Sequence, residues 1–288
     1  MSVGIHFGPA GNSDSFYAAG NKSTLQMPGY LEQQGLNAYE YQCGRGVKIT
    51  EKTACALGEK ARVHGVALSL HAPYYINLAN PDPEKQEATW NYILQSCQAA
   101  QWMGAERVVI HSGAVMKQTR AQALEVALGV LREAQRRVDE AGLGEVRLCP
   151  ETMGKIGQLG DLEEVLTLCS LDERMLPTLD FGHLNARTIG GCHTYQQLKE
   201  VLEAVENRLG RDRLRIFHSH FSKIEYTPKG GEKRHLTFAD TLYGPEFEPL
   251  SELVYQKGLE PTFICESAGT QTEDAREMRR LFESQSAR

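Results

Sequence analysis

The sequence predicts an α/β fold, a TIM (β/α)8 barrel with a metal site at the C-terminal face of its strands. Short apolar runs rich in β-branched residues alternate with longer segments of helical period, which is the pattern of βαβ units. Eight such pairs fit within the 288 residues, the number that closes a barrel. An open doubly wound sheet is the alternative, but no G-x-G-x-x-G motif follows the first predicted strand.

The predicted strands are short and apolar at consecutive positions, as in residues 108–110 (Val-Val-Ile) and 262–265 (Thr-Phe-Ile-Cys). This pattern is typical of strands that helices cover on one face and a packed interior covers on the other. In chain order, the strands are expected at residues 3–7, 38–42, 67–71, 107–111, 146–151, 176–180, 214–221 and 262–266.

A helix is expected after each strand. Several of these helices have recognisable start signals: Thr50 with Thr53, Asp82-Pro83, and Thr194 ahead of an amphipathic run. In chain order, the helices are expected at about residues 23–34, 50–64, 82–104, 118–142, 160–170, 195–209, 246–257 and 271–285.

Composition and length favour one globular domain spanning residues 1–288. Hydrophobic residues make up 41% and charged residues 24% of the chain, and this ordinary usage excludes a disordered, collagen-like or coiled-coil protein. No membrane-spanning run and no signal sequence are apparent, and the seven cysteines form no C-x-x-C pair, so we expect a cytoplasmic protein without a membrane partner. No protein partner is evident, and a monomer is expected. The net charge of −6 neither supports nor excludes a nucleic-acid substrate.

Six of the predicted strands carry a histidine or a carboxylate at or near their C-terminal ends. In a barrel these ends converge on the face where active sites are built. Imidazole and carboxylate without thiolate suit zinc or manganese, and six ligands exceed the needs of one catalytic ion. A polar network without metal is the alternative, but it would bury three carboxylates without a cation. The residues are His71, His111, Glu151, Asp180, His218 with His220, and Glu266.

Other histidines and cysteines have more varied expected roles. His183 and His235 follow the sixth and seventh strands and can hold a further ion together. His6 ends the first predicted strand, where it either points to the same rim or makes a structural hydrogen bond. Surface positions are expected for His64 and His193, and core positions for Cys43, Cys149 and Cys265.

At these residues the sequence resembles the endonuclease IV family of abasic-site endonucleases, within the xylose isomerase-like barrel superfamily. The resemblance covers essentially the whole chain. It rests on segments 71–78 (His-Ala-Pro-Tyr-Tyr-Ile-Asn-Leu), 108–113 (Val-Val-Ile-His-Ser-Gly), 151–154 (Glu-Thr-Met-Gly), 180–183 (Asp-Phe-Gly-His), His218 with Ser222-Lys223, Arg234-His235, and 264–267 (Ile-Cys-Glu-Ser).

The resemblance implies a zinc-dependent phosphodiesterase that cleaves duplex DNA 5′ to abasic sites in base excision repair. Two or three Zn²⁺ ions per chain are implied, with Mn²⁺ as a possible substitute. His71 and His111 would bind one ion, Glu151 would bridge to a second held by Asp180, His218 and Glu266, and His183 and His235 would bind the third. An ionised water bridging the ions would attack the phosphorus and leave a 3′-hydroxyl and a 5′-deoxyribose phosphate. Glu151 is the implied catalytic residue, and Tyr74, Arg45 and Arg234 are the candidate substrate contacts.

The sequence departs from the family pattern at two ligand positions. The family usually holds its third ion with an Asp-x-His pair, but Lys233 stands two residues before His235, so the site requires a substitute such as Glu232. After His218 the chain runs Ser219-His220-Phe221 rather than through the family's Asn and Asp. Because residues i and i+2 share a strand face, His220 can take over a ligand role.

Two other functions compete with the nuclease. A sugar isomerase or epimerase of the same superfamily would use a single divalent ion, held by two Glu, one Asp and one His. Residues Glu151, Asp180, His218 and Glu266 satisfy that arrangement. The Lys233 departure motivates the second alternative, a relative that binds metal or damaged DNA without efficient turnover. Two or three zinc ions per chain favour the nuclease, and one manganese ion favours the isomerase.

Overall fold

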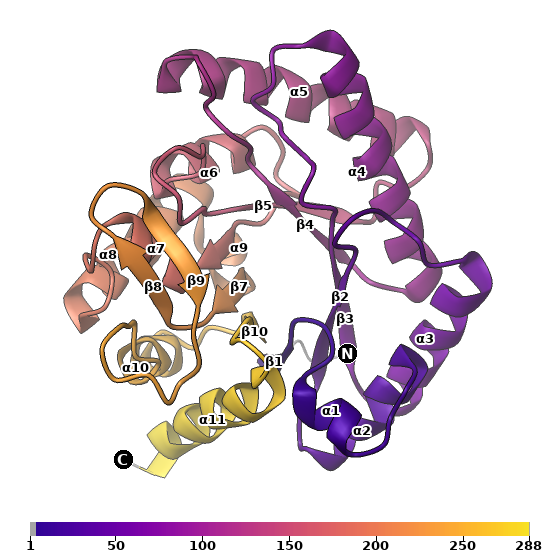
Figure 1. The fold of residues 1–288 in the computed structure, drawn as a ribbon, viewed down its shortest axis with the longest axis vertical. Helices are drawn as coiled ribbons and strands as arrows, with labels where there is room; N and C mark the ends of the chain where they lie inside the picture. The colour runs from indigo at the N-terminus through magenta and orange to yellow at the C-terminus, as the bar shows by residue number, and fades with distance from the viewer. Residues whose placement is uncertain (1–3, 288) are drawn as a thin grey trace.

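The computed structural model describes residues 4–287 and contains a parallel eight-stranded sheet curled into a barrel, with helices around it (Figure 1). The strand order is β1-β10-β7-β6-β5-β4-β3-β2. The strands are β1 (His6–Pro9), β2 (Ala38–Gln42), β3 (Ala67–His71), β4 (Arg107–His111), β5 (Arg147–Glu151), β6 (Thr178–Asp180), β7 (His218–Phe221) and β10 (Thr262–Cys265). The predicted TIM barrel is confirmed.

The sheet closes where β1 meets β2. Asn37 donates its backbone N–H to the Phe7 carbonyl at 3.1 Å, and Gly11 donates to the Glu40 carbonyl at 2.9 Å. Closure requires a glycine on β1, because a Cβ built on Gly8 would lie 1.8 Å from the Ala38 carbonyl oxygen. The two ends of the sheet therefore form a nearly closed ring.

The surrounding helices begin at recognisable caps. Thr119 and Asp161 each form a capping box, with Gln122 and Glu164 respectively, at the start of their helices. The helices are α1 (Asp14–Ala18), α2 (Met27–Gln33), α3 (Glu51–Val63), α4 (Pro83–Met103), α5 (Arg120–Glu140), α6 (Leu162–Cys169), α7 (Phe181–Arg187), α8 (Tyr195–Leu209), α9 (Arg211–Arg215), α10 (Glu248–Gln256) and α11 (Gln271–Glu283), with short 3₁₀ turns at Thr24–Gln26 and Ser284–Ala287.

Alternation along each strand separates the barrel interior from the helix-facing core. On β4, Val108 and Ile110 belong to the large core beneath the helices, whereas Val109 packs in a separate interior cluster with Cys149. Arg107, Val109 and His111 therefore share the inward face. This alternation places polar side chains inside both ends of the barrel.

Three sequence expectations are corrected. The first strand was expected at residues 3–7, but β1 covers 6–9, and residues 1–3 lie outside the described part. The seventh strand was expected to begin at Leu214, but Leu214 is buried in α9 and β7 begins at His218. No strand or helix was expected between residues 221 and 246, yet this segment holds a two-stranded hairpin of β8 (Ile224–Thr227) and β9 (Gly231–His235), which packs on α7.

The seven cysteines are unpaired, and Cys43, Cys149 and Cys265 are buried as expected. Within residues 4–287, none of the helices has both the length and the apolar character needed to cross a bilayer.

Candidate metal centre

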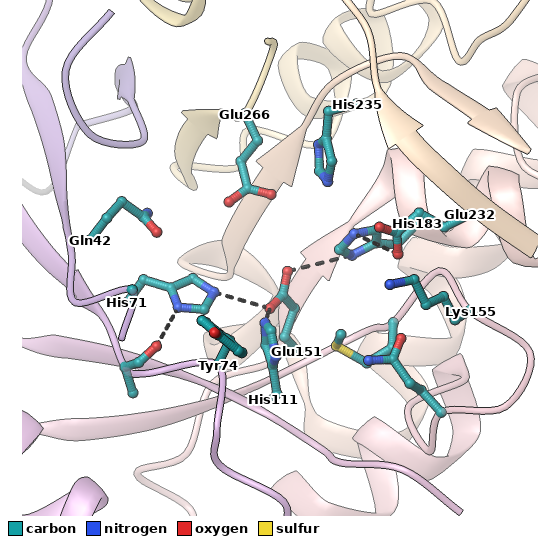
Figure 2. A pocket seen from close by; sticks show the side chains of 14 residues that line it. Gln42, His71, Tyr74, His111, Glu151, Lys155, His183, Glu232, His235 and Glu266 are labelled. Carbon is teal, nitrogen blue, oxygen red and sulfur yellow. Dashed lines mark hydrogen bonds and ion pairs between the residues drawn. The ribbon is translucent and has the colours of Figure 1, made fainter. Parts of the chain in front are cut away.

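A cavity of about 260 Å³ opens at the C-terminal ends of the barrel strands (Figure 2). Its walls come from the ends of several strands, the loops after them, and the β8–β9 hairpin. The lining residues are Gln42, Gly44, His71, Ala72, Tyr74, His111, Glu151, Met153, Lys155, Gln158, His183, Glu232, His235 and Glu266. The cavity thus combines imidazoles and carboxylates from distant parts of the chain.

Glu151, the last residue of β5, lies at the centre of this group. Its Oε2 is 3.4 Å from His71 Nε2 and 3.3 Å from His111 Nε2, while its Oε1 is 2.9 Å from His220 Nδ1. The Glu151 side chain is 1% exposed. Because Glu151 Oε1 also lies 3.5 Å from His183 Nδ1, four imidazoles share this one buried carboxylate, and Figure 2 labels His71, His111 and His183 among them.

A second set of ligand atoms surrounds the other side of Glu151. One atom each from Glu151, Asp180, His220 and Glu266 lies within 4.8 Å of the others. Buried Glu151 Oε2 and Asp180 Oδ2 have no hydrogen-bond partner among the described residues. These two oxygens face only imidazole nitrogens, at 3.3–3.4 Å for Glu151 and 3.1 Å for Asp180, so the donor set fits a divalent cation such as zinc or manganese.

His218 does not join this set, and His220 stands in its place. In the sheet, Asp180 is level with His220, whereas His218 is level with Thr178 and Thr262. Since both histidines face inward, His218 lies one strand period deeper in the barrel, roughly 6.6 Å below the rim. The structure therefore brings His220, rather than the expected His218, together with Glu151, Asp180 and Glu266.

Below the rim, a buried carboxylate on β2 links the two histidines. Glu40 Oε2 lies 2.9 Å from His218 Nε2 and accepts a hydrogen bond from Ser69 Oγ at 2.9 Å. Glu40 Oε1 lies 2.9 Å from His220 Nε2 and accepts from Gln42 Nε2 at 3.0 Å. Glu40 therefore supports His220 from the side opposite Glu151.

A third group comes from α7 and the hairpin. One atom each from His183, Glu232 and His235 lies within 4.8 Å of the others, and His183 Nε2 is 3.5 Å from Glu232 Oε2. Lys233 turns away, because its Nζ pairs with Glu225 at 2.5 Å and its side chain is 55% exposed. Of these two neighbours, Glu232 therefore lies beside His183 and His235, and Lys233 does not.

Backbone and hydroxyl oxygens fix the orientation of three of these imidazoles. His71 Nδ1 lies 2.8 Å from the Ala72 carbonyl and His183 Nδ1 lies 2.9 Å from the Thr152 carbonyl, so each Nδ1 donates. His235 Nδ1 is 2.9 Å from Ser222 Oγ. Each ring therefore keeps Nε2 free for a metal, which is the usual arrangement around protein metal sites.

Burial and mutual charge shift the pKa values of these groups. At Glu151, burial opposes ionisation, but the charge of His220 and hydrogen bonds from His183, His220 and His71 hold its pKa well below the usual range. At His71, burial is outweighed by the hydrogen bond and charge of Glu151, which raise the pKa to about 9. Burial lowers the pKa of His111 to about 3 and raises that of Glu266. Glu151 is therefore an anion near neutral pH, as a bridging ligand must be.

The candidate substrate contacts fall in different places. Tyr74 lines the cavity and is 49% exposed, with its hydroxyl 3.2 Å from that of Tyr75. Arg45 is exposed in the turn after β2, and Arg234 pairs with Glu225 at 2.6 Å on the hairpin. Neither arginine lines the cavity.

The remaining histidines lie away from this cavity. His6 begins β1, so it lies at the opposite end of the barrel rather than at the rim. His193 is exposed, and His64 lies 2.9 Å from Glu32 at the end of α3.

Sequence reasoning missed Glu40. A signal was present, since Glu40 is a carboxylate inside the predicted strand 38–42 and shares the inward stripe with Gln42. The signal was weak because charged residues at a strand centre are also common on solvent-facing surfaces.

Comparisons with known proteins agree on the fold and point to endonuclease 4. A family model described as xylose isomerase-like TIM barrel matches residues 29–285. An uncharacterized protein of Methanocaldococcus jannaschii, MJ0133, is 34% identical over 240 residues, covering 82% of this chain and 84% of that protein. A probable endonuclease 4 of Mycoplasma pneumoniae is 28% identical over 205 residues, 69% of this chain and 67% of that protein.

Solved structures show the same fold. A D-tagatose 3-epimerase-like protein aligns with a TM-score of 0.74 and 18% identity, over 98% of this chain and 99% of that chain. Endonuclease IV from Thermus thermophilus aligns with a TM-score of 0.65 and 20% identity, also over 98% and 99% of the two chains. The sequence resemblance to endonuclease IV is thus confirmed, while the structural matches show the barrel shared by nucleases and epimerases.

Proposed function

Because this chain belongs to the xylose isomerase-like TIM barrel family, we propose that it is a zinc-dependent phosphodiesterase of the endonuclease IV type. Its substrate would be duplex DNA, cleaved 5′ to abasic sites. The observation that carries the proposal is the pair His71 and His111, whose Nε2 atoms lie 3.4 and 3.3 Å from one oxygen of Glu151. A single-ion site does not need this pair in addition to the group around Glu266. The relatives named probable endonuclease 4 support the same reading.

The arrangement supports three ion positions. His71, His111 and Glu151 would hold the first ion, and Glu151, Asp180, His220 and Glu266 the second. His183, Glu232 and His235 would hold the third. Bound divalent ions would neutralise the phosphate and lower the pKa of an attacking water.

The protein's own residues would then position the substrate. Tyr74 stands half exposed at the mouth, where its ring can lie against the abasic sugar. Lys155 lines the cavity near His183 and can pair with a phosphate oxygen (Figure 2). Arg45 and Arg234 lie outside the cavity, and in this proposal they would contact flanking phosphates of a longer duplex.

Incision of a duplex oligonucleotide with one abasic site tests the proposal. The wild-type protein is expected to cut 5′ to the site and to leave a 3′-hydroxyl. His111→Ala, purified identically, should lose this activity, which controls for contaminating host nuclease. Absence of incision by zinc-loaded wild-type protein would refute the nuclease.

A sugar epimerase is the second candidate, and one observation favours it. The group of Glu151, Asp180, His220 and Glu266 contains the two Glu, one Asp and one His that a single-ion epimerase requires. The D-tagatose 3-epimerase-like neighbour shares this barrel. Metal content separates the candidates: the nuclease predicts two or three zinc ions per chain, and the epimerase predicts one manganese ion together with turnover of ketoses.

A further inference from the structure

A second cavity, of about 650 Å³, opens at the N-terminal end of the barrel, opposite the metal centre. Four of its lining residues are the first residues of their strands: His6 of β1, Ala67 of β3, Arg107 of β4 and Thr262 of β10. The C-terminal ends of α3 and α4 complete its wall. Because strand starts and strand ends lie at opposite mouths of the barrel, this cavity is separate from the candidate metal centre.

Arg107 is the distinctive side chain of this cavity. It lies on the inward face of β4, the face that carries His111 at the other end of the strand. Its Nη1 is buried and has no hydrogen-bond partner among the described residues. Burial lowers the pKa of Arg107, and the adjacent acid, Glu106, makes no ion pair with it within residues 4–287. A buried Nη1 without a hydrogen-bond partner is costly, so the site favours an incoming anion.

Neighbouring residues increase this preference. Arg147 stands directly beside Arg107 in the β4–β5 register, and like charges on facing strand positions repel each other. His6 lines the same cavity and offers an imidazole N–H as a second donor. An oxyanion at this position would offset the repulsion between Arg107 and Arg147. It would accept hydrogen bonds from Arg107 and His6.

The rest of the wall combines apolar residues with the carboxylates Glu59, which pairs with Arg62 at 2.6 Å, and Glu106. Val66, Leu68 and Trp102 line the cavity beyond Arg107. The volume lies in the range typical of small-molecule sites, which combine apolar walls with a few polar groups. We propose that this cavity binds a small organic oxyanion, a phosphate or carboxylate on a short apolar body, with Arg107 as its charge partner.

Trp102 offers a local readout of binding. The chain has two tryptophans, so Trp90→Phe leaves Trp102 as the only one. At constant ionic strength, we expect butyl phosphate and butyrate to change Trp102 fluorescence saturably, with inorganic phosphate binding more weakly for lack of an apolar body. The ratio of the two organic affinities identifies which oxyanion the site prefers.

Matched variants locate the binding. In the Trp90→Phe background, Arg107→Met should weaken binding about tenfold or more, because it removes the charged donor while keeping a similar volume. Arg132→Met, an exposed arginine on α5, should leave the affinity unchanged. His111→Ala should also leave it unchanged, which excludes binding at the metal centre. A response that survives Arg107→Met, or no saturable response to either organic anion, would overturn the proposal.

A second measurement does not depend on the variants folding. Cys55 lines this cavity and is the exposed cysteine, whereas the other six are buried. In the wild-type protein, saturating butyl phosphate should slow alkylation of Cys55 severalfold relative to chloride at equal ionic strength. An unchanged alkylation rate would argue against occupancy of the cavity.

Discussion

His218 and His220 differ in depth along one strand, and this difference assigns them different roles. His220 touches Glu151 at the rim, while His218 contacts Glu40 below it. We expect His220→Asn to lower bound zinc by one ion per chain and incision by about 100-fold or more. His218→Asn should keep the zinc content of the wild type. Elemental analysis of the purified variants measures their zinc content. If His218→Asn loses zinc and His220→Asn does not, the roles of the two histidines are the reverse of those expected here.

Glu232 and Lys233 are adjacent but face opposite ways on the hairpin. Glu232 lies against His183, whereas Lys233 pairs with Glu225. Glu232→Gln is therefore expected to lower zinc content by one ion per chain. Lys233→Ala is the matched control and should leave zinc content unchanged. If both variants bind zinc as the wild type does, the third ion position does not depend on Glu232.

For single residues, the sequence could predict that histidines and carboxylates gather at the rim, but not every residue that lies there. His71, His111, Glu151 and Glu266 follow from strand ends alone, because the last inward residue of each strand must face the rim. The choice between His218 and His220 depends on where β7 ends relative to β6, and sequence spacing does not contain that register. The contacts of Glu40 with His218 and His220 join strands that are far apart in the sequence, and the pattern of residues along the chain does not reveal such contacts.

Among the elements, α5 is tied to the loop after α6 by one arginine. Arg174 pairs with Asp139 at 2.8 Å and with Asp172 at 2.6 Å, and these contacts lower the pKa of both carboxyls. A lowered folded-state pKa gives stability that is present above the unfolded value of about 3.9 and is lost as pH falls through the folded value.

Arg174→Met should therefore lower the free energy of unfolding near pH 7 by at most about 1 kcal/mol, since these side chains are partly exposed. The difference from wild type should shrink as pH falls below the unfolded value of about 3.9, and it is lost as pH falls through the lowered folded-state pKa values of the two aspartates. Urea unfolding at pH 7 and pH 3 measures both values. An equal difference at the two pH values would show that Arg174 acts through packing rather than charge.

The sequence predicted most regular elements, and its errors have physical causes. Strands β2, β3 and β4 match the expected boundaries, because each carries apolar residues on its outward, helix-facing side. Leu214 was assigned to a strand because it is apolar, yet it is the buried residue of the short amphipathic helix α9. The β8–β9 hairpin was missed because its second strand reads Gly-Glu-Lys-Arg-His, a polar run without the alternation that marks a strand.

For the molecule as a whole, the proposed ions are also structural. Glu151, Asp180 and Glu266 bring three carboxylates to one rim, and two of their buried oxygens lack hydrogen-bond partners among the described residues. Ions that bind the folded chain alone stabilise it by mass action. Chelation should therefore lower the unfolding midpoint, by on the order of 10 °C for tightly held zinc, and added zinc should restore it.

Circular dichroism at increasing temperature measures this shift. Glu151→Gln serves as the control, because it should show a smaller response to chelation than the wild type. Equal unfolding midpoints with and without chelator in the wild type would mean that bound ions do not stabilise the fold. The neighbouring histidines would then compensate the charge of the rim carboxylates without a metal.

The closure of the barrel through β1 has a consequence for how the chain is made. A ribosome releases β1 first and β10 last, yet β1 pairs with β10 residue by residue, from His6 with Thr262 to Pro9 with Cys265. Glu266 follows β10 directly, so the rim lacks one carboxylate until the final strand has emerged. We therefore expect β1 of the growing chain to remain unpaired on one side until β10 has emerged. Completion of the ring and completion of the cation site would then be the same late event in biogenesis.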